Sequence, residues 1–316
     1  VEATGRNFRE VMWTLGLLPH EALQDGFAGP TLGMECAGVV EAVGESVGEF
    51  AVGDREIAFA TACFASHVVV SASAVTKRPG DLDAAATASV PVAFLTAFYS
   101  LIELGQLEED ETVLIHGGAG GVGLAALQIA KWRGAKVFAT AGTVEKWALL
   151  ERLGADRVFD SRALAFADEA VAATGGEGVD VVLNSLAGEA MERSIGALKP
   201  FGRFLELGKR DFYADTKLGL RPFRRNLSYF GIDADQLMKH RPKTAKRILR
   251  TVMDLFVAGE LTPLPYRQFG AEGVRDAYRL MQSAGHIGKI IVEAPEPQAE
   301  TPAPTPVTAP GKAYLL

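Results

Sequence analysis

The spacing of hydrophobic residues changes along the chain and separates a β-rich part from an α/β part. Between residues 31 and 80, short apolar stretches alternate with glycines and with a turn at 52–55, and this pattern predicts short β-strands, one of them at 66–70. From Leu82 the apolar spacing becomes helical and stays helical through 94–104. We therefore expect a small β-rich domain over residues 1–89.

Beyond residue 110, apolar runs that read as buried strands alternate with amphipathic helices. The run Val113-Leu114-Ile115 is typical of a strand buried on both faces of a parallel sheet. Strands are expected at 113–115, 136–140, 157–160, 179–184, 203–207 and 227–232. Helices are expected from 124 to the stop at Gly134 and at 145–153, 166–174, 189–198 and 244–258. This order predicts an α/β fold with a doubly wound, parallel, six-stranded Rossmann sheet over residues 90–232, while 233–293, with a last strand at 289–292, return to the β-rich domain.

A glycine-rich turn follows the first of these strands and opens the next helix. Gly118, Gly120 and Gly123 form G-x-G-x-x-G, a spacing that 34 glycines also produce by chance, so the strand before it and the helix after it decide its meaning. We expect Gly118 to allow the tight turn, Gly120 to let the backbone approach a pyrophosphate, and Gly123 to let helix and strand pack closely. The expected contacts to phosphate are Gly118, Ala119, Gly120, Gly121, Val122 and Gly123, at the positive end of the helix.

The end of the second strand of this unit favours NADPH over NADH. An NAD-selective site places an Asp or Glu about 20 residues after the first glycine, whereas this chain has Thr140 there. Thr143 and Lys146 follow, so a hydroxyl and an ammonium lie where a carboxylate would repel a 2′-phosphate. Lys146 is equally well explained as a solvated helix lysine. The absence of an acidic residue at position 140 is therefore the stronger evidence for NADPH.

Composition and charge exclude several other classes of protein. The net charge is −7, which disfavours a nucleic-acid partner, and no apolar run reaches the roughly 20 residues of a membrane span. The two cysteines, Cys36 and Cys63, cannot form a disulfide framework or a four-cysteine zinc site, and no signal peptide is present. We expect a cytoplasmic protein in which both cysteines are buried small hydrophobes.

The two ends suggest that the chain is part of a larger protein. It opens on what reads as the end of a strand, and residues 294–310 are rich in Pro, Ala, Thr and Glu. Residues 311–316 become apolar again, as at the start of another strand. A tail at a natural C-terminus is the alternative; we expect residues 294–316 to form an interdomain linker.

Five motifs together resemble one family. They are Asn7-Phe-Arg-Glu, Phe94-Leu-Thr-Ala-Phe-Tyr, the His116 loop, Leu183-Asn-Ser-Leu-Ala-Gly-Glu and Phe204-Leu-Glu-Leu-Gly-Lys209. Over residues 1–293 the chain resembles the enoyl reductase domains of type I polyketide and fatty acid synthases, in the zinc-free, quinone-reductase-like branch of the medium-chain dehydrogenase/reductase superfamily. The resemblance implies a GroES-like substrate domain beside the Rossmann domain.

The resemblance also implies an activity and partners. NADPH would reduce a trans-2-enoyl thioester on an acyl carrier protein, with hydride added at the β-carbon and a proton at the α-carbon. The neighbours would be other synthase domains, a ketoreductase next, and the domain is a possible homodimer. Further cofactor-binding candidates are Asn7, Thr96, Arg162, Asn184, Leu207, Gly208 and Lys289.

Lys209 and Asp233 are the catalytic candidates that the resemblance implies. Lys209 follows a predicted parallel strand at the edge where such sheets bind ligands, and its ammonium could protonate the enolate. Alternatively, Lys209 neutralises cofactor phosphate or pairs with Asp211, and Asp233 caps a helix or forms an ion pair. Asn7 either faces the nicotinamide ribose or closes a turn. Leu18 stands where some relatives have a tyrosine proton donor, so that donor is absent.

Three other functions compete with enoyl reduction. A zinc alcohol dehydrogenase is disfavoured because Met34 stands where those enzymes carry a histidine ligand, so we expect no metal. A free-standing NADPH:quinone or alkenal reductase shares the fold but acts on a free small molecule. A non-catalytic cofactor-binding module is disfavoured by the intact glycine loop together with Lys209 and Asp233.

Overall fold

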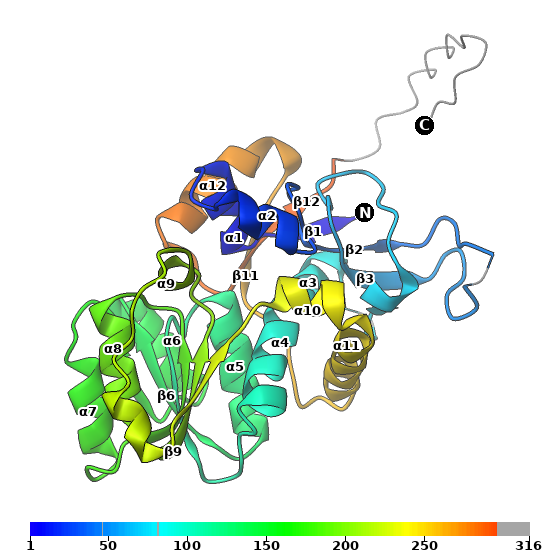
Figure 1. The fold of residues 1–316 in the computed structure, drawn as a ribbon. Helices are drawn as coiled ribbons and strands as arrows, with labels where there is room; N and C mark the ends of the chain where they lie inside the picture. The colour runs from blue at the N-terminus through cyan, green and yellow to red at the C-terminus, as the bar shows by residue number, and fades with distance from the viewer. Residues whose placement is uncertain (46, 81, 296–316) are drawn as a thin grey trace, which may run out of the picture.

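A computed structural model describes residues 1–45, 47–80 and 82–295. The expected linker at 296–316 and its apolar end lie outside these residues. Figure 1 shows a parallel sheet flanked by helices below, and a second part above it in which the N-terminal strands lie beside the C-terminal strand. In the described part of the chain, every helix is too short or too polar to cross a membrane.

The lower sheet contains the six expected strands, all parallel, in the order β10-β9-β8-β5-β6-β7. Their bounds are β5 (Thr112–Ile115), β6 (Lys136–Ala141), β7 (Arg157–Asp160), β8 (Val179–Asn184), β9 (Leu198–Glu206) and β10 (Ser228–Gly231). The strand order reverses between β5 and β8, and a crevice at the carboxyl ends of such strands is where these sheets bind ligands. The expected doubly wound α/β sheet is confirmed.

Alternation along the strands explains why helices cover both faces of this sheet. In β5, Val113 and Ile115 join one core cluster with residues of α4 and α5, whereas Leu114 joins a second cluster with residues of α7 and α8. The helices that cover the sheet are α4 (Pro91–Phe98), continued by a π-helix (Tyr99–Leu104), then α5 (Gly121–Trp132), α6 (Val144–Arg152), α7 (Phe166–Ala173) and α8 (Glu189–Gly196).

The upper sheet joins both ends of the described chain. Its order is β11 (Tyr266–Phe269), β12 (Lys289–Glu293), β1 (Ala3–Gly5), β2 (Glu35–Val39), β3 (Arg55–Phe59) and β4 (Val75–Lys77). Thr4 of β1 lies opposite Val292 of β12 on one side and Cys36 of β2 on the other. The expected return of the strand at 289–292 to the β-rich part is therefore confirmed.

The expected strand at 66–70 is wrong. Val68 and Val70 pack against the small cluster around Cys36 and Ala58, and Val69 is fully exposed, so the apolar alternation is real. No described strand pairs with this segment, and a strand requires a hydrogen-bonded neighbour.

The remaining helices of the described chain range from 4 to 16 residues in length. They are α1 (Phe8–Thr14), α2 (His20–Asp25), α3 (Ala84–Ala88), α9 (Arg210–Tyr213), α10 (Ala234–His240), α11 (Pro242–Val257) and α12 (Val274–Gln282), with 3₁₀ turns at Ala72–Ala74, Arg221–Arg225 and Ala271–Gly273. Phe256 of α11 packs edge-on against Phe94 of α4, with ring centroids 5.0 Å apart. Asp235 of α10 accepts a hydrogen bond from the Ala28 N–H at 2.8 Å, which ties α10 to the segment before β2.

Candidate active site

The glycine loop joins β5 to α5 and folds back on itself. Gly117 adopts φ of +62°, in the left-handed region, so the tight turn falls on Gly117 and not on Gly118 as expected. A Cβ at Gly118 would lie 3.0 Å from the Cβ of Ala139, so Gly118 is required for packing against β6. A Cβ at Gly123 would lie 2.4 Å from the Gly117 carbonyl oxygen, which places Gly123 in the close packing expected of it.

The start of α5 fits a phosphate group. The N–H groups of Val122 and Gly123 donate no hydrogen bond to another described residue, and they lie at the positive end of the helix. Gly120 forms an isolated parallel β-bridge with Gly288, which engages the Gly121 N–H. Gly120, the residue before α5, leaves room for a ligand, since a Cβ there would meet only the Gly117 carbonyl oxygen, at 3.3 Å. Gly288 donates its N–H to the Ala119 carbonyl at 2.8 Å, so the entry to β12 lies against this loop.

Thr140 braces the loop from inside the fold. It is fully buried, and its Oγ1 lies 3.1 Å from Nδ1 of His116, whose Nε2 lies 2.8 Å from Oγ of Ser194. Burial lowers the pKa of His116 to about 3, so the ring is neutral at pH 7. The Thr140 hydroxyl is therefore used within the protein, and residues beyond β6 are left to select the cofactor.

Two cations lie together beyond the ends of β6 and β7. Burial and the nearby charge of Arg162 lower the pKa of Lys146, whose ammonium donates to the Ala284 carbonyl at 2.7 Å. A Cβ on Gly142 would lie 3.2 Å from Nε of Arg162, so this glycine keeps the guanidinium close to β6. Thr143 caps α6 by accepting the Lys146 N–H at 3.4 Å. Neither cation pairs with a carboxylate among the residues described, so the pair is available to an anion.

Lys209 and Asp233 meet at the carboxyl ends of β9 and β10. Nζ of Lys209 lies 3.1 Å from Oδ2 of Asp233 and donates to the Ile232 carbonyl at 2.8 Å. Both side chains are about one-quarter exposed, at 24% and 28%. The alternative pairing of Lys209 with Asp211 is wrong, because among the residues described Lys209 forms its ion pair with Asp233, while Asp211 accepts from the Gly188 N–H at 2.8 Å. Asp233 combines two of the expected roles, since it also caps α10 by accepting the Asp235 N–H at 3.0 Å.

The other predicted residues on this edge are bound within the protein. Asn184 is fully buried and donates to the Leu186 carbonyl at 2.8 Å and to the Glu206 carboxylate at 2.6 Å. Leu207 donates its N–H to the Asn184 carbonyl at 2.8 Å. Thr96 lies buried on α4. These residues shape the edge of the sheet.

Lys289 lies in a buried network with Asn7. Its ammonium donates to the Arg6 carbonyl at 2.8 Å, to Oδ1 of Asn7 at 2.9 Å and to the Glu35 carboxylate. Three acceptors match its three N–H bonds, so Lys289 orders the segment around Asn7. Glu35 also accepts from Nδ2 of Asn7 at 2.8 Å and from the Val92 N–H, in the first turn of α4, at 2.7 Å.

Arg6 and Glu10 form a second buried pair next to this network. Their nearest charged atoms are 3.0 Å apart, and the Arg6 guanidinium lies between the rings of Phe64 and Tyr278. Burial lowers the pKa of Arg6 to about 10 and raises the pKa of Glu10. Glu10 also accepts the Asn7 N–H at 3.2 Å, so the pair is tied to the residue that Lys289 contacts.

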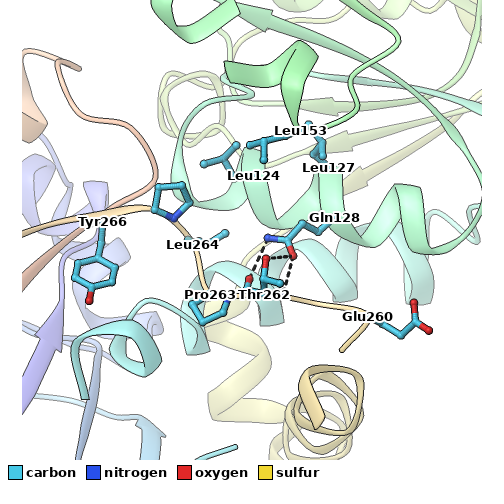
Figure 2. Close-up of a pocket in the computed structure, with 10 residues that line it drawn as sticks. Leu124, Leu127, Gln128, Leu153, Glu260, Thr262, Pro263, Leu264 and Tyr266 are labelled. Atoms are coloured by element: carbon cyan, nitrogen blue, oxygen red, sulfur yellow. Dashed lines mark hydrogen bonds between the residues drawn. The ribbon is translucent and has the colours of Figure 1, made fainter. Parts of the chain in front are cut away.

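Two hollows on the surface differ in character. Figure 2 shows an open apolar groove of about 560 Å³ between α5 and residues 260–266, where Gln128 is hydrogen-bonded to Thr262. None of the predicted site residues lines it. A small polar cavity of about 80 Å³ has Asp233, Tyr213 and Glu21 in its wall, so Asp233 of the Lys209–Asp233 pair borders a hollow between α2 and α10.

A metal site is not formed by the described residues, where no group of three His, Cys, Asp or Glu side chains lies close enough to hold an ion. Cys36 and Cys63 are free and buried, as expected.

Sequence reasoning missed several residues that the structure brings into the site. Glu206 lies between Asn184 and the Gly208 N–H, and Glu35 joins Asn7 to Lys289. Glu206 is part of the Phe204–Lys209 motif, and its alternation with apolar neighbours in a strand predicted to be buried was an available signal.

Comparisons with known proteins identify the family. The family described as "Alcohol dehydrogenase GroES-like domain" matches residues 1–82, and the family described as "Zinc-binding dehydrogenase" matches residues 153–292. The chain is 42% identical over 320 aligned residues to a phenolphthiocerol/phthiocerol polyketide synthase of Mycobacterium tuberculosis, covering 100% of this chain and 14% of that protein. It therefore spans only a small part of the curated relatives it matches.

Solved structures agree with this assignment. The enoyl reductase CurK superposes with a TM-score of 0.85 at 38% identity, over 93% of this chain and 90% of that one. A mycobacterial protein, Rv1454c, solved in complex with NADPH, superposes with a TM-score of 0.81 at 25% identity, over 92% of this chain and 89% of that one. The chain belongs to the enoyl reductases of polyketide synthases, a nicotinamide-dependent oxidoreductase family within the medium-chain dehydrogenase/reductase superfamily.

Proposed function

We propose that this chain catalyses the NADPH-dependent, zinc-independent reduction of a trans-2-enoyl thioester carried on an acyl carrier protein, as one domain of a synthase. The observation that carries the proposal is the Lys209–Asp233 pair at the carboxyl edge of the same sheet whose β5–α5 turn leaves the N–H groups of Val122 and Gly123 free. The polyketide synthases among its relatives support neighbouring synthase domains as partners.

The residues divide the work between binding and proton transfer. The N–H groups of Val122 and Gly123 hold the pyrophosphate. Lys146 and Arg162 hold the 2′-phosphate, since a fixed cation pair without a carboxylate partner favours an extra dianion. When bound, NADPH supplies the hydride that reduces the β-carbon of the substrate. The negative charge then develops on the thioester oxygen and the α-carbon.

Lys209 supplies the proton in this proposal. Its Nζ has two protein partners, Ile232 and Asp233, so one of its three N–H bonds is free to point at the substrate. Asp233 keeps the ammonium charged and oriented until the proton leaves for the α-carbon. Product release and a proton from solvent restore the pair.

The test is consumption of NADPH with crotonyl-pantetheine, run beside a simple quinone and repeated with NADH. We expect the thioester to be reduced to its saturated product, with NADPH well ahead of NADH. Turnover of the quinone without the thioester would instead establish the alternative, a free-standing quinone or alkenal reductase. NADPH binding without turnover of either substrate would establish the non-catalytic module.

A further inference from the structure

Glu206, the last residue of β9, is a buried carboxylate between two turns of the site. It is 2% exposed. Oε2 accepts a hydrogen bond from Nδ2 of Asn184 at 2.6 Å, and Oε1 accepts one from the Gly208 N–H at 2.5 Å. Both distances are typical of charge-assisted hydrogen bonds, and each oxygen holds the turn after a different strand.

These contacts form a closed ring that includes the proposed proton donor. The Glu206 carbonyl accepts the Ile232 N–H at 2.9 Å, and the Ile232 carbonyl accepts a hydrogen bond from Nζ of Lys209 at 2.8 Å. Gly208, bound to the carboxylate, directly precedes Lys209 in the chain. Glu206 therefore contacts Lys209 in two ways: through the backbone of Gly208, and through Ile232, which binds the Lys209 side chain.

The carboxylate also determines which residue fits at position 208. A Cβ on Gly208 would lie 2.7 Å from Oε1 of Glu206, so the turn and the carboxylate are in direct contact. A larger residue at position 208 would therefore displace either the Glu206 carboxylate or the turn that begins at Leu207.

We propose that Glu206 is a positioning residue for the reduction: its carboxylate fixes the turns at 184–186 and 207–209 and thereby the place of Nζ of Lys209. This inference rests on the proposed function. The ionised carboxylate accepts both hydrogen bonds at full strength. Protonation removes the charge and adds a donor to one oxygen that already faces an N–H donor, which weakens that hydrogen bond.

The environment of Glu206 gives the proposal a pH signature. Burial raises its pKa to about 7, opposed by the hydrogen bonds from Asn184 and Gly208; the charged and titratable groups facing it are Lys209, Asp211 and Tyr229. Turnover that depends on the ionised form rises as the pH increases through about 7. Stability changes in the opposite direction. Because the pKa of Glu206 is higher in the folded protein than in the unfolded chain, ionisation of Glu206 favours unfolding. The free energy of unfolding therefore decreases as the pH rises from about 4.5 to about 7.

The experiment compares Glu206→Gln with Glu56→Gln. Glu56 is a matched control, since it is 5% exposed in the other sheet, burial raises its pKa to about 7, and its oxygens have no hydrogen-bond partner among the residues described. Turnover of crotonyl-pantetheine is measured between pH 5 and pH 9 at saturating NADPH. The dissociation constant of NADPH, from titration of the cofactor, and the unfolding midpoint are measured over the same pH range.

We expect Glu206→Gln to lower kcat by about tenfold to a hundredfold, the equivalent of one charged hydrogen bond, and to remove the acidic limb of the pH profile. We expect Glu56→Gln to retain the kcat of the parent and the acidic limb of its pH profile. A Glu206→Gln enzyme with the kcat and pH profile of the parent would overturn the proposal. If the Glu206→Gln variant does not fold, the pH profile of the parent enzyme tests the proposal. Turnover by the parent that does not rise as the pH increases through about 7 contradicts the proposed role of Glu206.

Failure of the proposed function has a different outcome. In that case the parent protein binds NADPH but reduces no thioester. The positioning role is then decided by NADPH titration, where Glu206→Gln must weaken binding at least tenfold relative to Glu56→Gln, and equal affinities reject it.

Discussion

The ammonium of Lys209 lies 3.1 Å from the carboxylate of Asp233, although they are far apart in the chain. Parallel pairing of β9 with β10 brings the two residues together, because each follows the carboxyl end of its strand. Both remain about one-quarter exposed, so the pair can reach a substrate. The register of the sheet thus builds the proposed proton-transfer site.

Replacing Lys209 tests this site. Lys209→Met removes the ammonium and keeps most of the apolar length, and we expect kcat for the enoyl thioester to fall about 10²- to 10⁴-fold, the usual contribution of a general acid. Steady-state kinetics and NADPH titration measure the effect. Lys217→Met is the control, because that lysine pairs only with the exposed Asp215 among the residues described. A large loss of NADPH affinity with kcat retained would instead assign Lys209 to cofactor phosphate.

Arg162 and Lys146 determine cofactor preference in the proposal. Arg162→Ala and Lys146→Ala should each raise KM for NADPH roughly tenfold or more and leave KM for NADH nearly unchanged, since only NADPH carries the 2′-phosphate. Kinetics with both cofactors check this result. Lys131→Ala, which removes an exposed partner of Asp156, should alter neither. Equal effects on the two cofactors would contradict the assignment.

His116 should make stability depend on pH. We expect His116→Ala to lower the free energy of unfolding by about 2–4 kcal/mol at pH 7, because Thr140 and Ser194 each lose a buried partner. The pKa of His116 is about 3 in the folded protein and 6.5 in the unfolded chain, so between these values only the unfolded state is protonated. The stability of the parent therefore decreases as the pH is lowered from 6.5 towards 3. The difference between parent and variant should therefore shrink below pH 6.5, and urea titrations would reveal a constant difference if this is wrong.

Breaking the buried Lys289–Glu35 pair should lower the free energy of unfolding strongly, and a second substitution should restore part of the loss. Lys289→Met leaves the Glu35 carboxylate buried without its cation, and we expect a loss of about 3–5 kcal/mol. Adding Glu35→Gln removes the uncompensated charge and should restore part of that loss. A double-mutant cycle from urea unfolding measures the coupling. Additive losses would show that the two charges act independently.

The strand–helix alternation, and with it the parallel sheet, was predictable because each strand carries a short apolar run and each turn a local signal. The glycine loop was predictable for the same reason, except that its left-handed residue is Gly117. The segment at 66–70 shows the limit of such reasoning. Its apolar alternation is strand-like, but pairing requires a neighbour that only the tertiary arrangement supplies.

The sequence by itself determined which chemical groups are present: free N–H groups at a helix start, a lysine after a buried strand, and no acid at position 140. Only the tertiary structure decided how those groups are used. It turned the Thr140 hydroxyl inward to His116, engaged all three N–H bonds of Lys289, and placed the Glu206 carboxylate between two turns. The physical reason is that hydrogen-bond partners of buried polar groups come from strands distant in sequence, and local patterns record burial but not the partner.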